Sequence, residues 1–310
     1  MGCEVGEELA LIVVNYGSSA LLASLLAPLS ASLPGSTTVV VDNWSTADER
    51  RRVAALADER GWILVAPKSN LGFGAGINLG AAAALERGAT FLLLLNPDAS
   101  ITPEAVCALV ERARAEPAAL YSPRISRSDG STWFAGADLH LDDGRLRNRS
   151  ARVAGRRIEP WLSGACLLVH SSLWQEVGGF DEDYFLYWED VDLSHRVLAA
   201  GGALVVCDDI PAIHDEGGTH ASAVRQGDRR KSDTYYYYVI RNRALFAAKH
   251  LEPGDNVAWA RLERAVAWEV LLQGGRRQFL RSLGPLVVAR RAIRDGRMLA
   301  SAALSRRFPE

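Results

Sequence analysis

The segment LALIVVN, residues Leu9–Asn15, is a short apolar run rich in β-branched side chains, and it predicts a buried β-strand. Three similar runs follow along the chain, at Thr37–Val41 (TTVVV), Trp62–Ala66 (WILVA) and Phe91–Leu95 (FLLLL). Segments with helical character separate these runs. Strands that alternate with helices are typical of a parallel sheet covered on both faces, so the first hundred residues predict an α/β fold.

The texture of the sequence changes after residue 100. A helix is expected from Pro103 to about Ala115, and residues 120–158 form short polar segments that predict hairpins or an excursion from the sheet. Apolar runs at Trp161–His170 and Ala203–Cys207 predict two further strands. We therefore divide the chain into an α/β domain at residues 1–224 and a helical region at residues 225–310.

The composition sets limits on the function. The chain has 310 residues, of which 48% are hydrophobic and 23% are charged, and its formal net charge is −2. This is typical of a soluble globular protein and argues against a general nucleic-acid binder, which is usually strongly basic. The four cysteines are scattered without a C-x-x-C pair, which favours a reducing cytoplasm and gives no sign of a disulfide framework or structural zinc.

The same limits concern location. The N-terminus is acidic, unlike a secretory signal, and no apolar run approaches the roughly 18 residues of a membrane span. We therefore expect a cytoplasmic protein.

Polar side chains follow three of the predicted strands, namely Asn15, Asp42, and Asn96 with Asp98. Ligands bind outside the carboxyl ends of strands in open parallel sheets, so these residues mark a predicted ligand edge. Asp42 can accept a hydrogen bond from a base or a ribose, and its structural alternative is a helix N-cap. Asp98 can bind a divalent cation that bridges phosphates, and its alternative is a turn residue after Pro97.

A glycine-rich segment, Gly72–Gly76, follows the third predicted strand. Its backbone amides can approach phosphates, and the alternative is a helix start without a ligand. A dehydrogenase is a further hypothesis, but the dinucleotide fingerprint belongs in the first strand–helix turn, which argues against NAD. His214 lies just past a predicted strand, where its imidazole can join Asp98 in a metal site; a structural histidine is the alternative.

The segment GGFDEDYFLYWEDVDL, Gly178–Leu193, places acidic side chains beside aromatic ones where a loop becomes a helix. A carboxylate in such a loop can act as a general base while the aromatic side chains exclude water. The alternative is that Glu189, Asp190 and Asp192 occupy a first helical turn only because the helix dipole favours acids there.

Taken together, these segments resemble the family 2 glycosyltransferases, which are inverting nucleotide-sugar enzymes of GT-A fold, and within them a rhamnosyltransferase-like branch. The matching segments lie in the family's order over about residues 9–216, and they are IVVNY (Ile12–Tyr16), VVDNWS (Val40–Ser45), NLGFGAGINLG (Asn70–Gly80), LLNPDA (Leu94–Ala99), WLSGACLLVH (Trp161–His170) and GGFDEDYFLYWEDVDLSHRV (Gly178–Val197). The last segment is quite specific.

The resemblance implies an architecture. It implies a GT-A fold, with a Rossmann-like, mostly parallel sheet flanked by helices and a helical C-terminal region. In this arrangement residues 1–100 hold the nucleotide sugar and residues 101–224 hold the acceptor.

The resemblance also implies roles for individual residues. Asp190 is implied as the general base, Asp42 as a contact of the nucleotide base, and Asp98 and His214 as ligands of Mg²⁺ or Mn²⁺ at the diphosphate. The residues expected to bind the nucleotide sugar are Asn15, Asp42, Asn70, Gly72, Gly76, Asn78, Asn96 and Asp98, and those expected on the acceptor side are Trp161, Gly164, Trp188 and Glu189. For both tryptophans, core packing is the alternative to stacking on a sugar.

One departure from the family pattern concerns the metal. The usual Asp-x-Asp is Asn96-Pro97-Asp98 in this chain, so the first carboxylate is missing.

The C-terminal region is strongly basic. Residues 241–310 contain 14 lysines and arginines against 6 aspartates and glutamates. Two interpretations of this pattern remain open. The helices can contact a membrane surface, as in a protein that acts at the inner face of the membrane, or they can pack on the catalytic domain or form a homodimer.

The sequence thus predicts a metal-dependent inverting glycosyltransferase. It moves a sugar, for example the deoxysugar rhamnose, from a dTDP, UDP or GDP donor to a hydroxyl of a glycan, a lipid-linked molecule or a small molecule. A non-catalytic nucleotide-sugar-binding protein of the same fold is the alternative from a different class. A nucleotidyltransferase is less well matched, because residues 15–20 lack a basic, glycine-rich loop.

Overall fold

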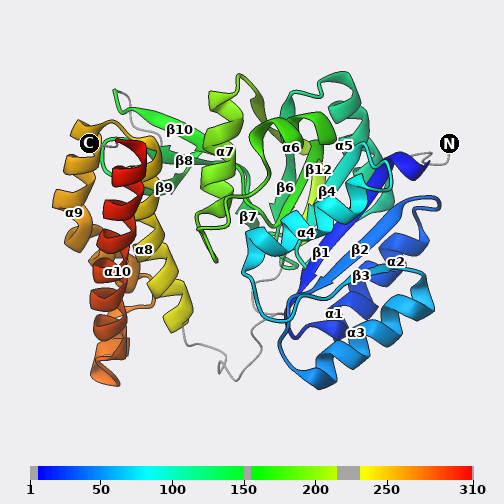
Figure 1. Cartoon of the computed structure of the whole chain (residues 1–310), viewed down its shortest axis with the longest axis horizontal. Coiled ribbons are helices and arrows are strands. Elements are labelled where there is room, and N and C mark those ends of the chain that lie inside the picture. The colour runs from blue at the N-terminus through cyan, green and yellow to red at the C-terminus, as the bar shows by residue number, and fades with distance from the viewer. Residues whose placement is uncertain (1–5, 150–154, 215–230, 309–310) are drawn as a thin grey trace. The chain divides into compact units, whose positions relative to one another are not determined.

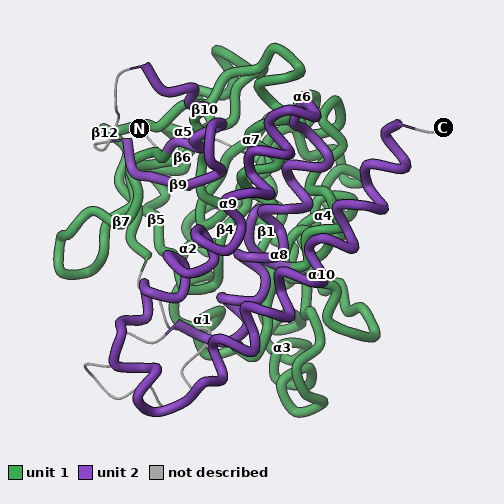
Figure 2. Tube along the Cα trace, turned by 90° about the vertical axis from the view of Figure 1, so that its left-hand side faces the viewer, with its two compact units in different colours: residues 1–137, 160–185, 189–221 green, residues 138–159, 186–188, 222–310 purple. Residues whose placement is uncertain are grey.

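The computed structural model describes residues 6–149, 155–214 and 231–308. The chain divides into two compact units, which Figure 2 colours separately. Unit 1 contains residues 1–137, 160–185 and 189–221, and unit 2 contains residues 138–159, 186–188 and 222–310. Unit 2 therefore includes two short inserts besides the C-terminal helices. The predicted boundary at residues 224–225 lies outside the described residues.

Unit 1 is built on one mixed, mostly parallel sheet, flanked by helices as Figure 1 shows. Its strand order is β3-β2-β1-β4-β11-β6-β12-β5, and β7 pairs with β6. The strands are β1 (Leu9–Asn15), β2 (Thr37–Asp42), β3 (Ile63–Val65), β4 (Phe91–Leu95), β5 (Ala99–Ile101), β6 (Ala119–Ser126), β7 (Thr132–Phe134), β11 (Cys166–His170) and β12 (Ala203–His214). The four strands from β3 to β4 are parallel, whereas β11 runs antiparallel to both β4 and β6. The expected GT-A type of sheet is confirmed.

The helices of unit 1 connect the strands and cover the sheet. They are the 3-10 helix η1 (Gly6–Glu8), α1 (Ser19–Leu21), the π-helical turn η2 (Leu22–Leu26), α2 (Ala27–Ala31), α3 (Ala47–Arg60), α4 (Phe73–Leu85), α5 (Pro103–Ala115), α6 (Ser171–Val177) and α7 (Glu189–Ala199). Local chemistry sets several of their ends. Thr46 and Thr102 cap the N-termini of α3 and α5 through their hydroxyls, and Gly61 ends α3 in the left-handed conformation.

The core of unit 1 forms around the central strands. Every residue of β1 and β4 is buried, which explains their continuous apolar sequences, since strands covered on both faces need no polar alternation. Their parallel register brings the carboxyl ends of β1, β2 and β4 to one edge of the sheet. That edge carries the polar residues considered below.

Unit 2 contains a small sheet and a helical bundle. The sheet has the order β10-β8-β9, made by β8 (Ala137–His140), β9 (Arg145–Asn148) and β10 (Ile158–Trp161), and most of its residues belong to unit 2. The helices are α8 (Asp233–His250), α9 (Pro253–Leu272), the 3-10 helix η4 (Arg276–Leu280) and α10 (Gly284–Arg307). The expected helical C-terminal region is confirmed.

Two buried clusters stabilise unit 2. Tyr236, Ile240 and Leu271 belong to a cluster formed by α8, α9 and α10. A second, aromatic cluster contains Trp259 and Phe246, whose rings stack with centroids 5.9 Å apart. No helix among the described residues is long and apolar enough to cross a membrane.

The cysteines differ from the expectation. Cys166 and Cys207 are free and buried, but Cys107 is disulfide-bonded. The scattered spacing carries no signal of this bond, because pairing depends on where the fold brings the Cβ atoms.

Candidate active site

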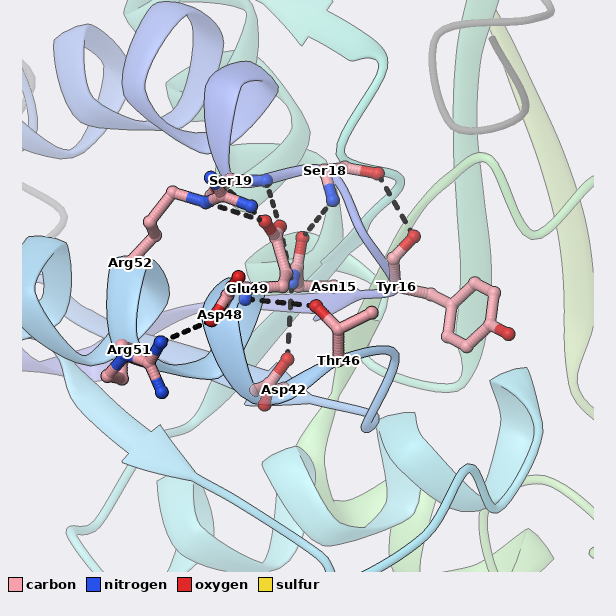
Figure 3. A network of polar contacts seen from close by, with 10 residues as sticks. All are labelled: Asn15, Tyr16, Ser18, Ser19, Asp42, Thr46, Asp48, Glu49, Arg51 and Arg52. Atoms are coloured by element: carbon pink, nitrogen blue, oxygen red, sulfur yellow. Dashed lines mark hydrogen bonds and ion pairs between the residues drawn. The ribbon is translucent and has the colours of Figure 1, made fainter. Parts of the chain in front are cut away.

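Asn15 and Asp42 lie side by side at the ends of β1 and β2, where the parallel register pairs them. The amide of Asn15 donates to Asp42 Oδ1 (3.3 Å) and to Glu49 Oε1 (3.4 Å), and its carbonyl oxygen accepts from the backbone of Ser18 (3.0 Å). Figure 3 shows this network. Asn15 is fully buried and its polar atoms are used within the protein, so its main role in this structure is to join the two strand ends.

Asp42 has a side-chain exposure of 0% and two strong partners. Its Oδ2 accepts from Arg50 Nε (2.6 Å), while Asn15 occupies its Oδ1. Arg50 Nη2 also donates to the backbone oxygens of Asp42 (3.0 Å) and Pro67 (2.6 Å). The Asp42 carboxylate is therefore covered by Arg50 and has no contact with solvent. Sequence reasoning missed Arg50, whose only signal is a place within a run of three arginines on α3.

Glu49 was also missed, and it organises the same corner. Its side chain accepts from the backbone (2.5 Å) and the hydroxyl (2.9 Å) of Ser19, at the start of α1. Burial is the largest single influence on Glu49 and acts to raise its pKa, but the hydrogen bonds from Ser19, Asn15 and Arg52 together hold that pKa below its ordinary value. Glu49 is thus kept ionised at a helix N-terminus, where a negative charge is favoured.

The glycine-rich loop before α4 is held by protein atoms. Asn43, buried after β2, accepts from Leu71 N (2.9 Å) and donates to Gly72 O (2.7 Å). Gly72 N donates to Asn70 Oδ1 (2.8 Å), and Phe73 N donates to Phe185 O (2.9 Å). These three successive amides already have acceptors, so they are not available to a phosphate in this conformation.

Close packing explains why glycine occupies these positions. Gly72 has φ of +92°, and a Cβ there would lie 2.2 Å from Phe185 O. A Cβ on Gly74 would lie 2.8 Å from Phe180 Cβ, and one on Gly76 would lie 3.0 Å from Val14. The structural alternative weighed for this loop therefore accounts for its glycines.

Asn78, on α4, links the loop to the acidic segment that precedes α7. Its amide donates to Phe180 O (2.8 Å) and Glu182 Oε1 (3.1 Å), and its carbonyl oxygen accepts from Phe180 N (2.9 Å). Hydrogen bonds thus join the helix that follows the glycine-rich loop to the acidic segment before α7, although about one hundred residues separate them along the chain.

Asp98 and His214 meet at the end of β4, as predicted from the sequence. The antiparallel register of β12 and β5 places His214 opposite Ala99, and His214 Nε2 lies 3.0 Å from Asp98 Oδ1. Both side chains are buried, and His214 Nδ1 has no hydrogen-bond partner among the described residues. Trp133 packs on the imidazole, with ring centroids 4.4 Å apart.

An imidazole beside a carboxylate is a donor pair that suits a divalent cation, and the orphaned Nδ1 is an unusual cost for a purely structural histidine. The residues therefore fit a metal ion, but as two ligands only. No cluster of three or more metal-binding side chains occurs in the described part of the chain. Further ligands would have to come from the substrate or from water.

Asp190 lies in the first turn of α7, and its side chain reaches the segment just before β11. Its Oδ2 accepts from Gly164 N (3.1 Å) and its Oδ1 from Val191 N (2.9 Å). Burial raises the pKa of Asp190 to about 6, although the two backbone hydrogen bonds act in the opposite direction. No cation pairs with this carboxylate among residues 6–149, 155–214 and 231–308. A carboxylate of this kind is suited to accept a proton near neutral pH.

The segment that holds Asp190 also adjoins the Asp98 site. Gly164, whose amide donates to Asp190, is followed directly by Ala165. The backbone oxygen of Ala165 accepts a hydrogen bond from Asn96 N (2.9 Å). Ser194 of α7 reinforces the arrangement by donating to Asp190 O (2.7 Å) and accepting from Leu162 N (3.1 Å). Gly164 and Ala165 therefore connect the carboxylate of Asp190 with the segment that follows β4.

Glu189 is 6% exposed, and its Oε2 has no partner within the described residues. Burial, and then the charge of Asp190, raise the pKa of Glu189 well above its usual range. Trp161, expected on the acceptor side, packs its ring against Phe134 at 5.5 Å and lies against the core of unit 1.

Trp188 belongs to unit 2 and is buried against Phe246 and Trp259, at centroid distances of 5.4 and 6.2 Å. Core packing thus describes Trp188 better than the predicted stacking on a sugar. Tyr187 and Trp188 adopt φ of +64° and +75°, and Asn242 of α8 donates to the backbone oxygen of Tyr187 (2.6 Å). Large side chains rarely adopt this conformation, so the turn just before Glu189 is strained and held in place.

Comparison with known proteins identifies the family of the chain. The sequence profile of Glycosyl transferase family 2 matches residues 10–178, more than half of the chain. The chain belongs to glycosyl transferase family 2. Within the family it is rhamnosyltransferase-like: the N-acetylglucosaminyl-diphospho-decaprenol L-rhamnosyltransferase of Mycobacterium tuberculosis is 30% identical over 233 residues, which cover 66% of this chain and 75% of that relative.

Solved structures agree on the fold of this family 2 member. GalNAc-T7 with UDP, GalNAc and Mn²⁺ has a TM-score of 0.58 at 13% identity, over 99% of this chain and 59% of that one. The mannosyltransferase PcManGT from Pyrobaculum calidifontis, in complex with GDP-Man and Mn²⁺, has a TM-score of 0.53 at 16% identity, over 98% and 88%. These similarities show a GT-A fold for a chain whose family makes it a glycosyltransferase.

Proposed function

We propose that this chain transfers a sugar from a nucleoside-diphosphate donor to an acceptor hydroxyl with inversion at the anomeric carbon, and that Asp190 is the general base. The environment of Asp190 carries the proposal. The carboxylate is oriented by two backbone amides, has no cation beside it among the described residues, and has a pKa raised to about 6. These are the properties of a base that is ionised at neutral pH but retains affinity for a proton.

The chemistry is a single displacement. The acceptor oxygen forms a bond to the anomeric carbon while the bond from that carbon to the diphosphate oxygen breaks. Asp190 takes the hydroxyl proton, and the nucleoside diphosphate leaves with the bonding electron pair from the opposite face. Base catalysis from a positioned carboxylate contributes about 10²–10⁴-fold to the rate.

Asp98 and His214 would hold Mg²⁺ or Mn²⁺ in this proposal, together with oxygens of the donor. The bound ion would offset the negative charge on the leaving diphosphate. The carboxylate of Asp98 supplies a hard oxygen ligand and His214 supplies a nitrogen ligand. Asn96 stands where the family pattern has its first carboxylate and contributes an amide without charge, so we expect weak binding of metal in the absence of a nucleotide.

The donor and the acceptor are also proposals. The name of the Mycobacterium tuberculosis relative includes an L-rhamnosyl donor group and a diphosphate-linked decaprenol acceptor. We propose a deoxysugar such as rhamnose, carried by dTDP, UDP or GDP, and an acceptor that is a lipid-linked diphosphate rather than a free glycan or a small molecule. The nucleoside is expected beyond β1 and β2, near Asp42, and the reacting carbon between Asp98 and Asp190.

A thermal-shift experiment tests the donor half of this proposal. The full chain is heated with dTDP, UDP, GDP or CDP, each with and without Mn²⁺. A ligand that binds only the folded state stabilises it by about 2.7 kcal/mol at 100 times its dissociation constant. We expect a metal-dependent rise in the melting temperature with at least one nucleotide, and loss of the metal dependence in His214→Ala.

Product formation tests the rest. Transfer from the nucleotide sugar selected by the thermal shift is followed on a polyprenyl-diphosphate sugar, and the anomeric configuration of the product is read by NMR. Binding of a nucleotide without transfer to any acceptor would favour the non-catalytic alternative. A retained anomeric configuration would contradict the single displacement.

A further inference from the structure

The segment from Arg276 to Arg294 in unit 2 forms a surface of unusual composition. It contains six arginines and no acidic residue, and it runs through η4, the following turn and the first half of α10. Its arginines, all of them exposed, are Arg276, Arg277, Arg281, Arg290, Arg291 and Arg294. We refer to this segment as the η4–α10 patch.

Large apolar side chains project from the same segment. Leu280 is 88% exposed, Val287 67% and Leu283 64%, and Leu286 is also exposed. Single exposed apolar residues are common on protein surfaces, but four within eight residues, at the tip of a turn between two helices, are not. Exposure to water makes such a cluster unfavourable, so it marks a contact surface.

The charge of the patch is only partly neutralised. Asp295, just beyond it, pairs with Arg294 (2.8 Å) and Arg291 (3.5 Å). Arg276, Arg277 and Arg290 have no ion pair within residues 6–149, 155–214 and 231–308. At least three guanidinium groups therefore remain available to an anionic partner beside the exposed leucines.

A groove between α9 and α10 continues the surface. Its volume is about 680 Å³, and its lining includes Trp268, Leu286, Ile293 and Met298 together with Arg290 and Arg294. Trp268 is exposed and stacks on Phe279, with ring centroids 5.2 Å apart. Apolar side chains rimmed by arginines, with a tryptophan among them, form the arrangement found at the boundary between lipid headgroups and acyl chains.

We propose that the η4–α10 patch docks on the surface of a bilayer that contains anionic lipids. Guanidinium groups bind lipid phosphates, while Leu280, Leu283 and Val287 enter the headgroup region. A second copy of the chain fits less well, because a symmetric contact would bring the same positive surface against itself. Nucleic acid would attract the arginines but leave the leucines exposed.

Vesicle sedimentation tests the proposal with the full chain. Vesicles of phosphatidylcholine with 30–40 mol% phosphatidylglycerol (roughly the range used to mimic an anionic surface) are compared with pure phosphatidylcholine. We expect binding to the anionic vesicles that weakens with salt, and little binding to the neutral ones.

Matched variants separate the patch from the rest of unit 2. Arg276→Gln with Arg277→Gln should weaken the partition by about 10- to 30-fold, and Leu280→Ser with Val287→Ser should weaken it at both low and high salt. Val257→Ser, at an exposed apolar position of α9, is the control and should bind as the original chain does. Equal binding to neutral vesicles, no binding to anionic ones, or a dimer that the Leu280 and Val287 substitutions dissociate would each overturn the proposal.

A second inference concerns Arg50 and rests on the proposed function. Asp42 is sealed, but Arg50 Nη1 has no partner among the described residues, and the guanidinium lies 4.6 Å from the ring centroid of Trp44. Trp44 is itself partly exposed at the edge of the sheet. We infer that Arg50, positioned by Asp42 and Trp44, donates from Nη1 to a carbonyl oxygen of the nucleobase.

This inference predicts which bases bind. Uracil and thymine carry a carbonyl oxygen at C4, and guanine carries one at C6. Cytosine carries an amino group at C4, which cannot accept a hydrogen bond from Arg50. Loss of a hydrogen bond from a charged group lowers affinity by about 10- to 100-fold. The original chain should therefore bind UDP or GDP more tightly than CDP.

Competition binding of UDP, dTDP, GDP and CDP to Arg50→Met tests this. The substitution should bring the affinity for the preferred nucleotide down to that for CDP, while Arg51→Met, an exposed neighbour on α3, keeps the preference. Retention of the preference in Arg50→Met would overturn this inference and leave the proposed function intact. Absence of binding by the original chain to any nucleotide would instead count against the proposed function.

Discussion

Two regions of unit 1 contain glutamates with nearly the same low exposure to solvent, and their pKa values shift in opposite directions. At the strand-end network, Glu49 is 5% exposed and its pKa is lowered, and at the start of α7, Glu189 is 6% exposed and its pKa is raised. Burial acts to raise the pKa of both. For Glu49, hydrogen bonds from Ser19, Asn15 and Arg52 outweigh this effect, whereas for Glu189 burial and then the charge of Asp190 both raise the pKa, and one carboxylate oxygen has no partner among the described residues.

The comparison separates structural acids from reactive ones. Arg50 holds the neighbouring carboxylate of Asp42 in place through an ion pair, as expected of a framework group. Asp190 receives only backbone hydrogen bonds and has a pKa raised to about 6, as expected of a group that exchanges a proton. Under the proposed function, the acidic residue at the strand end holds the framework and the one at the helix start accepts the proton.

The largest effect is expected from Asp190→Asn. The substitution removes the base while changing little volume, so kcat should fall by about 10²–10⁴-fold and the affinity for the nucleotide should change little. Steady-state transfer and nucleotide competition measure the two quantities. Asp183→Asn, an exposed acid of the same segment, should retain activity. Substantial transfer by Asp190→Asn would show that Asp190 is not the general base, and the contrast between the two regions would then have no catalytic meaning.

Gly72→Ala tests the loop that joins the two regions, because Asn43 holds Gly72 on one side and Phe185 approaches it on the other. A Cβ 2.2 Å from Phe185 O, on a backbone with φ of +92°, should lower the free energy of unfolding by about 2–3 kcal/mol. Urea unfolding measures this. Gly88→Ala has φ of +82° but no atom within 4 Å of the new Cβ, so it should cost about 1 kcal/mol. Equal losses would mean that close packing at Gly72 is unimportant.

The pH dependence sharpens the comparison. A base whose pKa is raised to about 6 must lose its proton before it can act, so kcat/KM should fall about tenfold per unit below pH 6 and level off above it. Rates measured from pH 4.5 to 8.5, with stability checked at each pH, test this. A profile that stays flat down to pH 4.5 would indicate that Asp190 has an ordinary pKa or is not the base.

The smallest effect distinguishes the two glutamates by stability alone. The lowered pKa of Glu49 stabilises the fold above pH of about 4.5, and that contribution is lost as pH falls through the folded value. Glu49→Gln should therefore cost about 1 kcal/mol at pH 7.5 and less at pH 4. The raised pKa of Glu189 opposes folding at neutral pH, so Glu189→Gln should leave stability at pH 7.5 unchanged or higher. Losses of equal size in both variants would contradict the contrast.

Some elements were predictable because their signal is local. Leu9–Asn15 and Phe91–Leu95 are continuous apolar runs, and a strand buried on both faces is the structure that such runs favour. The helix expected from Pro103 to about Ala115 matches α5, and its N-terminal cap, Thr102, acts on a residue only three positions away. The helical segment expected between the first two strands is not one continuous helix but α1, η2 and α2, because a π-helical turn interrupts it. The strand expected at Ala203–Cys207 extends to His214, since β6 and β5 supply the hydrogen bonds.

The sequence by itself determined the family, the alternation of strands and helices, and the residue types that carry the chemistry, since each is written in short motifs. Only the tertiary structure decided which of those residues act together. The register of β12 against β5 brings His214 to Asp98, Gly164 provides the amide that orients Asp190, and Arg50 covers Asp42. Charge and burial depend on neighbours that are far apart along the chain, so a motif names a carboxylate, and the packing around it decides whether that carboxylate holds the fold or accepts a proton.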